Sequence, residues 1–327
     1  MSFRTIEGGV VTRHGVATLP HDRSTLLWSE DGPTPLFLDS IDRWVDAMVA
    51  DEHGGGDGPD GLVEARVVAK ASGVLCGRPV AERLLARHLS GCSAEWGASE
   101  GGPVEEGRTV LVLHGPANEI LRIERTLLNL LGRLSGIASN TTQWAESAGS
   151  MCIAATRKTE WGLLDKWAIH IGGGLTHRLD RSDALMLKEN DIAAEMGEGE
   201  SELAAMRRMV SSVDMKQHAG FTVVEVRSVE QAVAAAAAWD ASQRARGGDE
   251  RVVLLLDNMG SEGASDAGTA LSERGLRQRC VLEGSGGVSL DSLGDWAASG
   301  VDLVSSSALN RGVEPLDLSM LIGAGGD

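Results

Sequence analysis

The segment Leu254-Leu255-Leu256-Asp257-Asn258 decides the fold, because an apolar strand ends there in polar residues and the pattern recurs along the chain. Strands are predicted to end near Thr156, Lys188, Val226, Asp257, Gly284 and Ser306. Helices are predicted between them, at Leu163–Ile171, Glu202–Val213, Val229–Trp239, Ala264–Arg274 and Leu290–Ala298. Strand–helix repeats of about 30 residues indicate parallel strands joined by right-handed crossovers. Because no GxGxxG motif follows the first strand, a barrel is favoured over a doubly wound sheet.

The first half of the chain has a pattern typical of a small α+β domain with an antiparallel sheet. Strands are predicted at Leu62–Lys70, where apolar and polar residues alternate, and at Val110–Leu113. A helix is predicted between them at Val80–Leu89. An earlier helix is predicted at Ser40–Ala50, with Ser40 as its N-cap.

Glycines are predicted to mark two further features, a break in a helix and a flexible loop. A long amphipathic helix begins near Asn118, and Gly136 is predicted to break it before a second helical stretch that runs to about Ala148. The glycine-rich segment His53–Gly58 is predicted to be a flexible loop, since no strand precedes it as a phosphate-binding loop requires.

Composition excludes several classes of function. The formal net charge of −17 argues against binding to nucleic acid or to an anionic membrane, both of which repel an acidic surface. No apolar run approaches the ~20 residues that a membrane span needs, and Met1–Val10 lacks a signal-peptide core, so a cytoplasmic location is expected. The four cysteines are scattered without a Cys-x-x-Cys pair, which predicts reduced thiols rather than disulfides or a zinc site.

Polar residues follow the predicted strands, at the end of a barrel where chemistry is done. Cations gather at the early strands and the nearby triple-glycine loop, namely Arg157, Lys158, His177, Arg178 and Lys188. Such a set suits a small molecule with two or more carboxylates. The middle strands carry Glu225 and Asp257, which suit ribose hydroxyls or a magnesium ion. The late strands carry Gly284–Gly287 and serines 305–307, which could hold a phosphate. The sequence therefore predicts a nucleotide-like substrate beside a dianionic partner.

Eight segments, in a characteristic order and spacing, give the chain a resemblance to the quinolinate phosphoribosyltransferases, also called nicotinate-nucleotide pyrophosphorylases (carboxylating). The segments are Glu124–Leu131, Arg133–Ala138, Thr156–Thr159, Gly172–Arg178, Leu187–Asn190, Val224–Val226, Leu256–Asn258 and Glu283–Gly287. The resemblance implies transfer of phosphoribosyl from phosphoribosyl pyrophosphate to quinolinate with decarboxylation, giving nicotinate mononucleotide, pyrophosphate and CO2 for NAD biosynthesis. It also implies an open α/β barrel of the type II phosphoribosyltransferase kind, packed on an α/β sandwich, in a homodimer.

The resemblance assigns a role to each part of the chain. Residues 1–40 would be an extension of unknown role, residues 41–134 with 312–327 the sandwich, and residues 135–311 the catalytic barrel. Quinolinate would be bound by Thr156, Arg157, Lys158, His177, Arg178 and Lys188, with Arg125 reaching in from the other subunit. Phosphoribosyl pyrophosphate would be bound by Glu225, Asp257, Ser285, Gly286, Gly287, Ser306 and Ser307.

The resemblance also implies Mg²⁺ at Glu225 and Asp257, held directly or through substrate or water. The catalytic residues would be Lys158, Lys188, Glu225 and Asp257, with either lysine a candidate for the proton transfer that follows decarboxylation.

Three alternatives stay open at the level of the sequence. A related phosphoribosyltransferase-like family is linked to molybdenum transport and shares the Thr-Arg-Lys-Thr motif. Lysines at barrel strand ends could instead form the imine of a Schiff-base aldolase. The family commonly has Asp at position 155 and Gly at position 307, where this chain has Ala155 and Ser307. These two changes motivate a third alternative, a non-catalytic paralogue that binds nucleotides.

Overall fold

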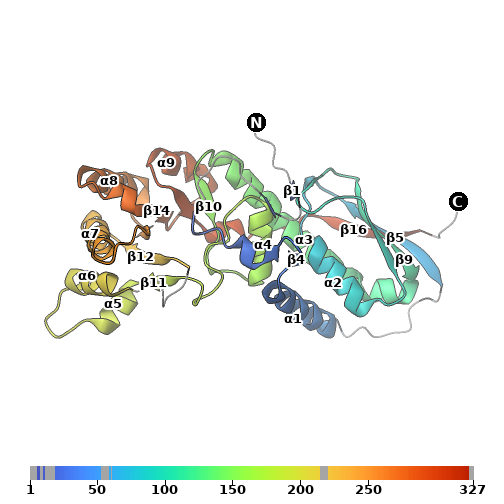
Figure 1. Ribbon diagram of the computed structural model, residues 1–327. Coiled ribbons are helices and arrows are strands. Elements are labelled where there is room, and N and C mark those ends of the chain that lie inside the picture. The colour runs from blue at the N-terminus through green and yellow to red at the C-terminus, as the bar shows by residue number, and fades with distance from the viewer. Residues whose placement is uncertain are drawn as a thin grey trace.

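Two layered units joined by one long helix make up the molecule (Figure 1). The computed structural model describes residues 6–7, 10–11, 19–52, 59, 61–213 and 220–323. The predicted loop at residues 53–58 lies outside these described residues. One unit is built on a parallel sheet and the other on an antiparallel sheet. The predicted architecture, an open α/β barrel packed on an α/β sandwich, is confirmed.

Six parallel strands form the barrel in the order β10-β15-β14-β13-β12-β11. Their bounds are β10 Cys152–Ala154, β11 Leu185–Leu187, β12 Thr222–Val226, β13 Val252–Asp257, β14 Cys280–Ser285 and β15 Leu303–Ser305. The barrel is open because its two edge strands, β10 and β11, do not pair with each other within the described part of the chain. All six predicted strands are present and end within two residues of the expected positions.

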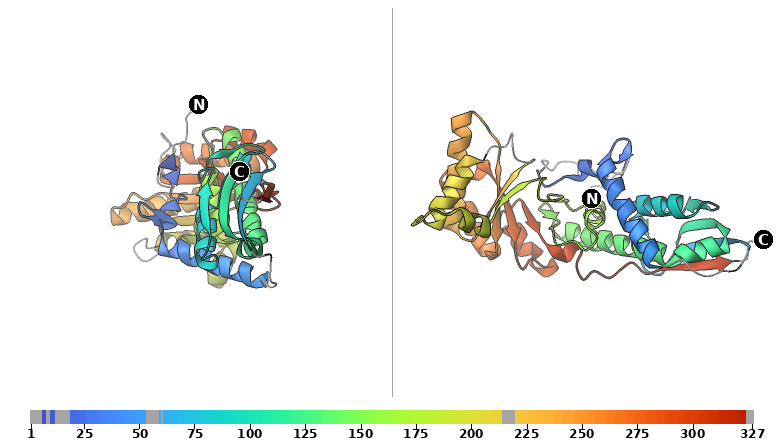
Figure 2. Two further views of the ribbon diagram at one scale, coloured as in Figure 1. Left: turned by 90° about the vertical axis from the view of Figure 1, so that its right-hand side faces the viewer. Right: turned by 90° about the horizontal axis from the view of Figure 1, so that it is seen from below.

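Helices follow the strands and cover the outside of the barrel (Figures 1 and 2). They are α4 Leu163–Ile171, α5 Glu189–Glu195, α6 Glu202–Ser212, α7 Val229–Arg246, α8 Gly260–Glu273 and α9 Leu293–Ala298. The 3-10 turns η2 Arg277–Arg279, η3 Leu290–Ser292 and η4 Ser307–Leu309 complete the connections. The side chains that point into the barrel form a separate apolar cluster, which includes Cys152, Ala154, Val223, Val253, Leu255, Val281 and Leu303.

The smaller unit is a four-stranded antiparallel sheet in the order β16-β5-β9-β7. These strands are β5 Leu62–Ala69, β7 Ser93–Trp96, β9 Thr109–Pro116 and β16 Leu318–Gly323. The last strand, β16, pairs with β5, so the end of the described chain returns from the barrel to this sheet. Helices α1 Pro35–Asp51 and α2 Arg78–His88 pack beside each other on this unit. Short two-residue strands are β1 Ile6–Glu7, β2 Val10–Val11, β3 Trp28–Ser29, β4 Gly32–Pro33, β6 Gly73–Val74 and β8 Pro103–Val104, and η1 is Ser24–Leu26.

Helix α3, Ala117–Ser147, runs unbroken through Gly136, so the predicted interruption is wrong. It packs on the antiparallel sheet through one part and on α4 and β10 through another, and thereby joins the two units. Gly136 is needed for close approach: a Cβ there would overlap the carbonyl oxygen of Glu314 on the segment that leads to β16. The stretch around Gly136 therefore lies directly under the returning chain, which explains a glycine inside a helix.

The start of α1 also differs from the prediction. The helix begins at Pro35, and the hydroxyl of Thr34 accepts the capping hydrogen bond from the Phe37 N–H. Ser40 is buried in the second turn and is not the N-cap. Proline at the first helical position after a threonine is a normal start signal, and the apolar spacing from Ile41 obscured it.

Candidate active site

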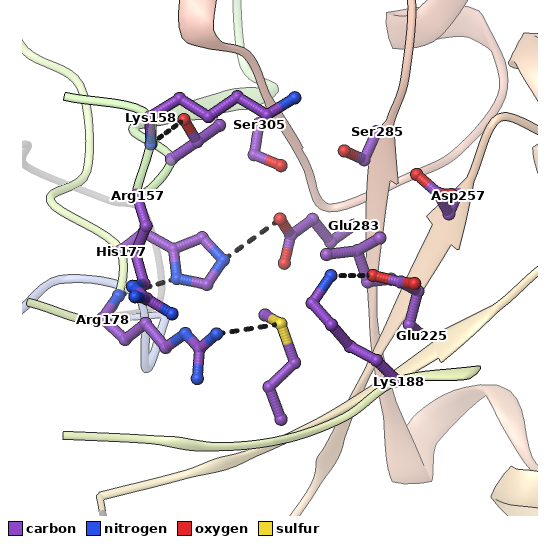
Figure 3. A pocket seen from close by; sticks show the side chains of 13 residues that line it. Arg157, Lys158, His177, Arg178, Lys188, Glu225, Asp257, Glu283, Ser285 and Ser305 are labelled. Atoms are coloured by element: carbon purple, nitrogen blue, oxygen red, sulfur yellow. Dashed lines mark hydrogen bonds and ion pairs between the residues drawn. The ribbon is translucent and has the colours of Figure 1, made fainter. Parts of the chain in front are cut away.

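A cavity of about 220 Å³ lies at the carboxyl ends of the barrel strands (Figure 3). Its walls are Thr156, Arg157, Lys158, His177, Arg178, Met186, Lys188, Glu225, Leu255, Asp257, Glu283, Ser285 and Ser305. All five cationic side chains predicted to act together therefore line one cavity, although they come from three separate segments of the chain. Arg157, His177 and Arg178 lie on one side, and Glu225 and Asp257 face them from the other.

Arg178 is the more enclosed of the two arginines that line this cavity, with 7% of its surface exposed. Its Nη1 donates to the Ala184 carbonyl oxygen at 3.1 Å, and its Nη2 donates to the Met186 sulfur at 3.2 Å. Its buried Nε has no hydrogen-bond partner among the described residues. Burial, and then the charges of Arg157 and Arg181, lower the pKa of the Arg178 guanidinium. A buried cation with an unused donor and a cationic neighbour is stabilised by an anionic ligand.

Lys166, on α4, lies beneath the cation cluster and was not predicted as a site residue. Its side chain is 1% exposed, and its Nζ donates to the carbonyl oxygens of Thr156 at 3.2 Å and Thr176 at 2.7 Å. These carbonyls precede Arg157 and His177, so one ammonium group connects the two loops that carry the cations. Burial lowers the pKa of Lys166 to about 7, with the charges of Arg157 and Arg178 acting in the same direction against that of Asp183.

The free energy of unfolding is expected to depend on pH through Lys166. The unfolded chain holds this proton up to about pH 10.5, whereas the folded chain releases it near pH 7. The unfolded state therefore binds more protons between these values, and stability should rise with pH by about 1 kcal/mol per pH unit from pH 7.5 to 9. Below pH 7 both states are protonated and the cost of burying the charge is fully present.

Urea unfolding of the wild type and Lys166→Met, repeated across this pH range, measures the effect as the difference between the two slopes. Lys70→Met provides the control, because Lys70 is exposed. An unchanged slope in Lys166→Met would show that another group causes the pH dependence.

One of the two carboxylates on the anionic side, Glu225, is paired with a cation of the same cavity. The Lys188 ammonium forms an ion pair with Oε2 of Glu225, on the neighbouring strand β12. Asp257 follows on β13, and one of its oxygens accepts from the Asn258 amide at 2.9 Å. The two carboxylates thus stand at adjacent strand ends, as the sequence predicted, and Lys188 bridges the cationic and anionic sides.

Both ring nitrogens of His177 have protein partners. Nδ1 accepts from the Arg178 backbone N–H at 2.7 Å, which requires the ring proton to be on Nε2. Nε2 therefore donates to Oε1 of Glu283 at 3.2 Å. Burial lowers the pKa of His177, so the neutral ring is favoured. Burial alone would raise the pKa of Glu283, but its interactions with His177 and His21 outweigh this and hold the pKa below the ordinary range.

His21 donates to the other oxygen of Glu283 and was missed by sequence reasoning. The His21 Nε2 lies 3.0 Å from Glu283 Oε2, and both side chains are fully buried. The three groups are close enough to suggest a metal site, with ligand atoms within 4.8 Å of one another. Metal binding through His177 Nε2 would require the proton on Nδ1, which faces the Arg178 N–H donor. The cluster is therefore arranged for hydrogen bonding.

The residues predicted to hold a phosphate are divided by the structure. Ser285 lines the cavity together with Ser305, the first of the three late-strand serines that the sequence indicated. Gly286, Gly287, Ser306 and Ser307 lie beside it without lining it. Ser306 donates to the Val288 carbonyl and caps the η4 turn. A Cβ at Gly286, whose φ is +90°, would overlap the Asn258 side chain, so glycine permits the ends of β13 and β14 to meet.

Arg125 lies apart from the other predicted quinolinate ligands. It lines a second cavity of about 520 Å³ on the α3 side, with Leu128, Asn129, Arg133, Trp161 and residues 314–318. The Arg133 guanidinium stacks on Trp161, with 4.8 Å to the ring centroid, and donates to buried Asp165. No residue is shared between the two cavities.

Comparison with known proteins places both units of this fold in one family. Residues 48–135 match the family model described as quinolinate phosphoribosyl transferase, N-terminal domain, and residues 137–321 match the C-terminal domain. The chain belongs to the quinolinate phosphoribosyltransferase family. A probable nicotinate-nucleotide pyrophosphorylase (carboxylating) of Methanothermobacter thermautotrophicus is 38% identical over 80% of this chain and 88% of the relative. The corresponding protein of Archaeoglobus fulgidus is 35% identical over 80% of this chain and 94% of the relative.

Solved structures of the quinolinate phosphoribosyltransferase family share the fold. NadC from Streptococcus pyogenes is 30% identical, with a TM-score of 0.73 over 89% of this chain and 98% of that one. The nicotinate-nucleotide pyrophosphorylase of Francisella tularensis is 26% identical, with a TM-score of 0.73 over 88% and 97% of the two chains. In the part of this chain that the structure describes, no helix combines the length and apolar character of a bilayer span.

Proposed function

We propose that this chain transfers the phosphoribosyl group of phosphoribosyl pyrophosphate to quinolinate and releases pyrophosphate and CO2. The observation that carries the proposal is the convergence of Arg157, Lys158, His177, Arg178 and Lys188 on one cavity opposite two carboxylates. A pyridine with two adjacent carboxylates matches this charge distribution, and the family relationship names the same reaction. The product would be nicotinate mononucleotide, a precursor of NAD.

The cationic side of the cavity would orient quinolinate. Arg157, Lys158 and Arg178 supply the donors, and the unused Nε of Arg178 is available to a carboxylate oxygen. Because both nitrogens of His177 are occupied, its contribution would be a fixed ring wall. The ring nitrogen of quinolinate would then attack the ribose carbon as the bond to pyrophosphate breaks. The alkylated ring accepts the electron pair left by CO2, and the ring carbon takes a proton, for which Lys158 and Lys188 are candidates.

The anionic side of the cavity fits a ribose and Mg²⁺. Among the described residues, one oxygen each of Glu225 and Asp257 has no protein donor, and carboxylate oxygens are the ligands that Mg²⁺ prefers. These two residues would hold the ion, which when bound stabilises the charge of the departing pyrophosphate. The 5′-phosphate would lie against Ser285, with the consecutive positive-φ residues Gly286 and Gly287 and the Ser306–Ser307 segment beside it.

The site would be completed by a second copy of the chain. Within one chain, Arg125 does not line the first cavity, because it lines a separate cavity with Arg133 and Trp161. In a homodimer, the second cavity of one subunit could face the barrel mouth of the other and supply Arg125 to it. The exposed position of Arg125 supports this arrangement.

A turnover assay tests the proposed reaction. Nicotinate mononucleotide formation is measured with quinolinate or nicotinate as acceptor, with Mg²⁺ and after its removal by chelation. Quinolinate should be the substrate, and nicotinate should react at least about 100-fold more slowly, because a buried cation is left without its carboxylate. Chelation should abolish turnover. Ligand binding without turnover would favour a non-catalytic nucleotide-binding protein, and borohydride trapping of a keto acid on Lys158 or Lys188 would favour an aldolase.

A further inference from the structure

The segment at residues 19–23 packs against inward-facing side chains of the barrel and forms hydrogen bonds with Thr176, which directly precedes His177. Leu19 packs in the cluster of inward-facing barrel side chains, together with Phe221. The Arg23 guanidinium donates three hydrogen bonds to Asp183, at 2.6, 2.9 and 3.2 Å, and the Arg23 backbone N–H donates to the Thr176 hydroxyl at 2.8 Å. The Thr176 hydroxyl in turn donates to the His21 carbonyl oxygen at 3.3 Å. These contacts fix the segment against the loop that carries His177 and Arg178.

His21 lies between Leu19 and Arg23 in this segment, and its ring is directed at Glu283. Each oxygen of this fully buried carboxylate receives one imidazole N–H, from His21 at 3.0 Å and from His177 at 3.2 Å. The two rings meet edge to face with their centroids 4.9 Å apart. A buried carboxylate needs such donors to stay ionised, since burial favours the neutral form. His21 therefore supplies half of the direct hydrogen bonding that holds Glu283 as an anion.

Glu283 in turn fixes the geometry of the cation loop. His177 has a φ of +53°, a left-handed conformation that is unfavourable for a side chain with a Cβ and needs support from its surroundings. The support comes from both ends of the ring, through Glu283 on β14 and through the Arg178 backbone N–H. A loosened Glu283 would release the His177 ring and, with it, the backbone of Arg178.

We infer that His21 is a positioning residue of the active site, acting through Glu283 and His177 on the loop that carries Arg178. The expected change in quinolinate kinetics rests on the proposed function, whereas the expected change at the His177 ring does not. It gives residues 19–23, part of the extension to which the sequence assigned no role, a place in the floor of the quinolinate site. Loss of the His21 hydrogen bond should weaken the binding of quinolinate rather than that of phosphoribosyl pyrophosphate, because Glu225 and Asp257 lie on the other side of the cavity.

Three variants separate positioning from packing. His21→Phe keeps a ring but removes the N–H, and should lower kcat/KM for quinolinate by about 10- to 100-fold, mainly through KM, as expected for loss of a donor to a buried charge. His21→Gln keeps an N–H donor and should recover most of that loss. Val253→Ala removes apolar contact from a strand of the same buried cluster, and should lower Tm while leaving the KM for quinolinate within about twofold, because Val253 does not line the cavity. The KM for phosphoribosyl pyrophosphate should change little in all three.

A double-mutant cycle tests whether the effect passes through Glu283. Glu283→Gln should reproduce the rise in KM, and adding His21→Phe to it should cause little further change. If His21→Phe does not fold, His21→Asn, whose amide is too short to reach Glu283, replaces it in the cycle. Additive effects, or a His21→Phe enzyme that differs from the wild type only in Tm, would overturn the inference.

A spectroscopic measurement keeps this inference separate from the proposed reaction. Long-range ¹H–¹⁵N correlation of the histidine side chains should show His177 as the neutral Nε2–H form in the wild type and in Val253→Ala. In His21→Phe the His177 signals should shift or broaden. If the wild type fails to turn over quinolinate, the proposed function fails while this result still supports the positioning of His177. Unchanged His177 signals in His21→Phe would overturn the inference whatever the activity.

Discussion

Replacing Arg178 by methionine is expected to lower kcat/KM for quinolinate by on the order of 10²- to 10³-fold, the effect of removing one partner from a buried ion pair. Methionine matches much of the volume of the side chain but provides no charge and no hydrogen-bond donor. Arg178 is 7% exposed, so water cannot replace the lost guanidinium. The KM for phosphoribosyl pyrophosphate should stay within about threefold, because Arg178 lies opposite Glu225 and Asp257.

Two further variants define what Arg178 contributes. Arg178→Lys keeps the charge but loses the planar fork, and should recover only part of the activity. Arg181→Met removes an exposed arginine three residues along the same loop and should change kcat/KM by less than about threefold. Steady-state kinetics with each substrate varied in turn measures these effects. Equal losses for Arg178→Met and Arg181→Met would mean that the loop acts through its total charge rather than through a specific contact.

Local sequence patterns were sufficient to predict most of the helices and strands of both units. The helix at Leu163–Ile171 was predicted to the residue, and the strand at Leu62–Lys70 to within one residue. Their signals are periodic apolar positions, which are local. The cation cluster could also be predicted, since parallel strands bring their carboxyl ends to one edge. What the periodicity cannot give is the packing of segments that are distant in the sequence.

The features that were predicted wrongly or missed all depend on contacts between segments that are distant in the sequence. Gly136 was taken as a helix break because its close contact is with Glu314, which is far away along the chain. His21 was missed because its partner, Glu283, follows 262 residues later. Glu283 itself was visible at a strand end, but its burial between two histidines was not. Lys166 was not predicted to be buried or to have a role, although a lysine among the apolar residues of α4 is unusual for a core helix.

Mixing two inactive variants is expected to restore activity if the site is shared between subunits. Arg125→Ala and Lys188→Ala should each be inactive as homodimers, since each removes one part of both sites. In a dimer of one chain of each kind, one site carries both changes and the other carries neither. Random exchange gives mixed dimers half the time, so the mixture should recover about a quarter of wild-type activity. The variants are mixed after partial unfolding and refolding, and the product is assayed over time.

A mixture of Lys188→Ala with Arg178→Met provides the matched control, because both residues line the same cavity of one chain. Every barrel in that mixture lacks one of them, so no intact site can form and activity should stay at the level of the single variants. Recovery in this control would show that monomers repair each other by another route. If Arg125→Ala and Lys188→Ala form mixed dimers, detected with two affinity tags, yet remain inactive, then Arg125 does not enter the partner's site. The second cavity, with Arg133 stacked on Trp161, would in that case serve the stability of the helix that joins the two units.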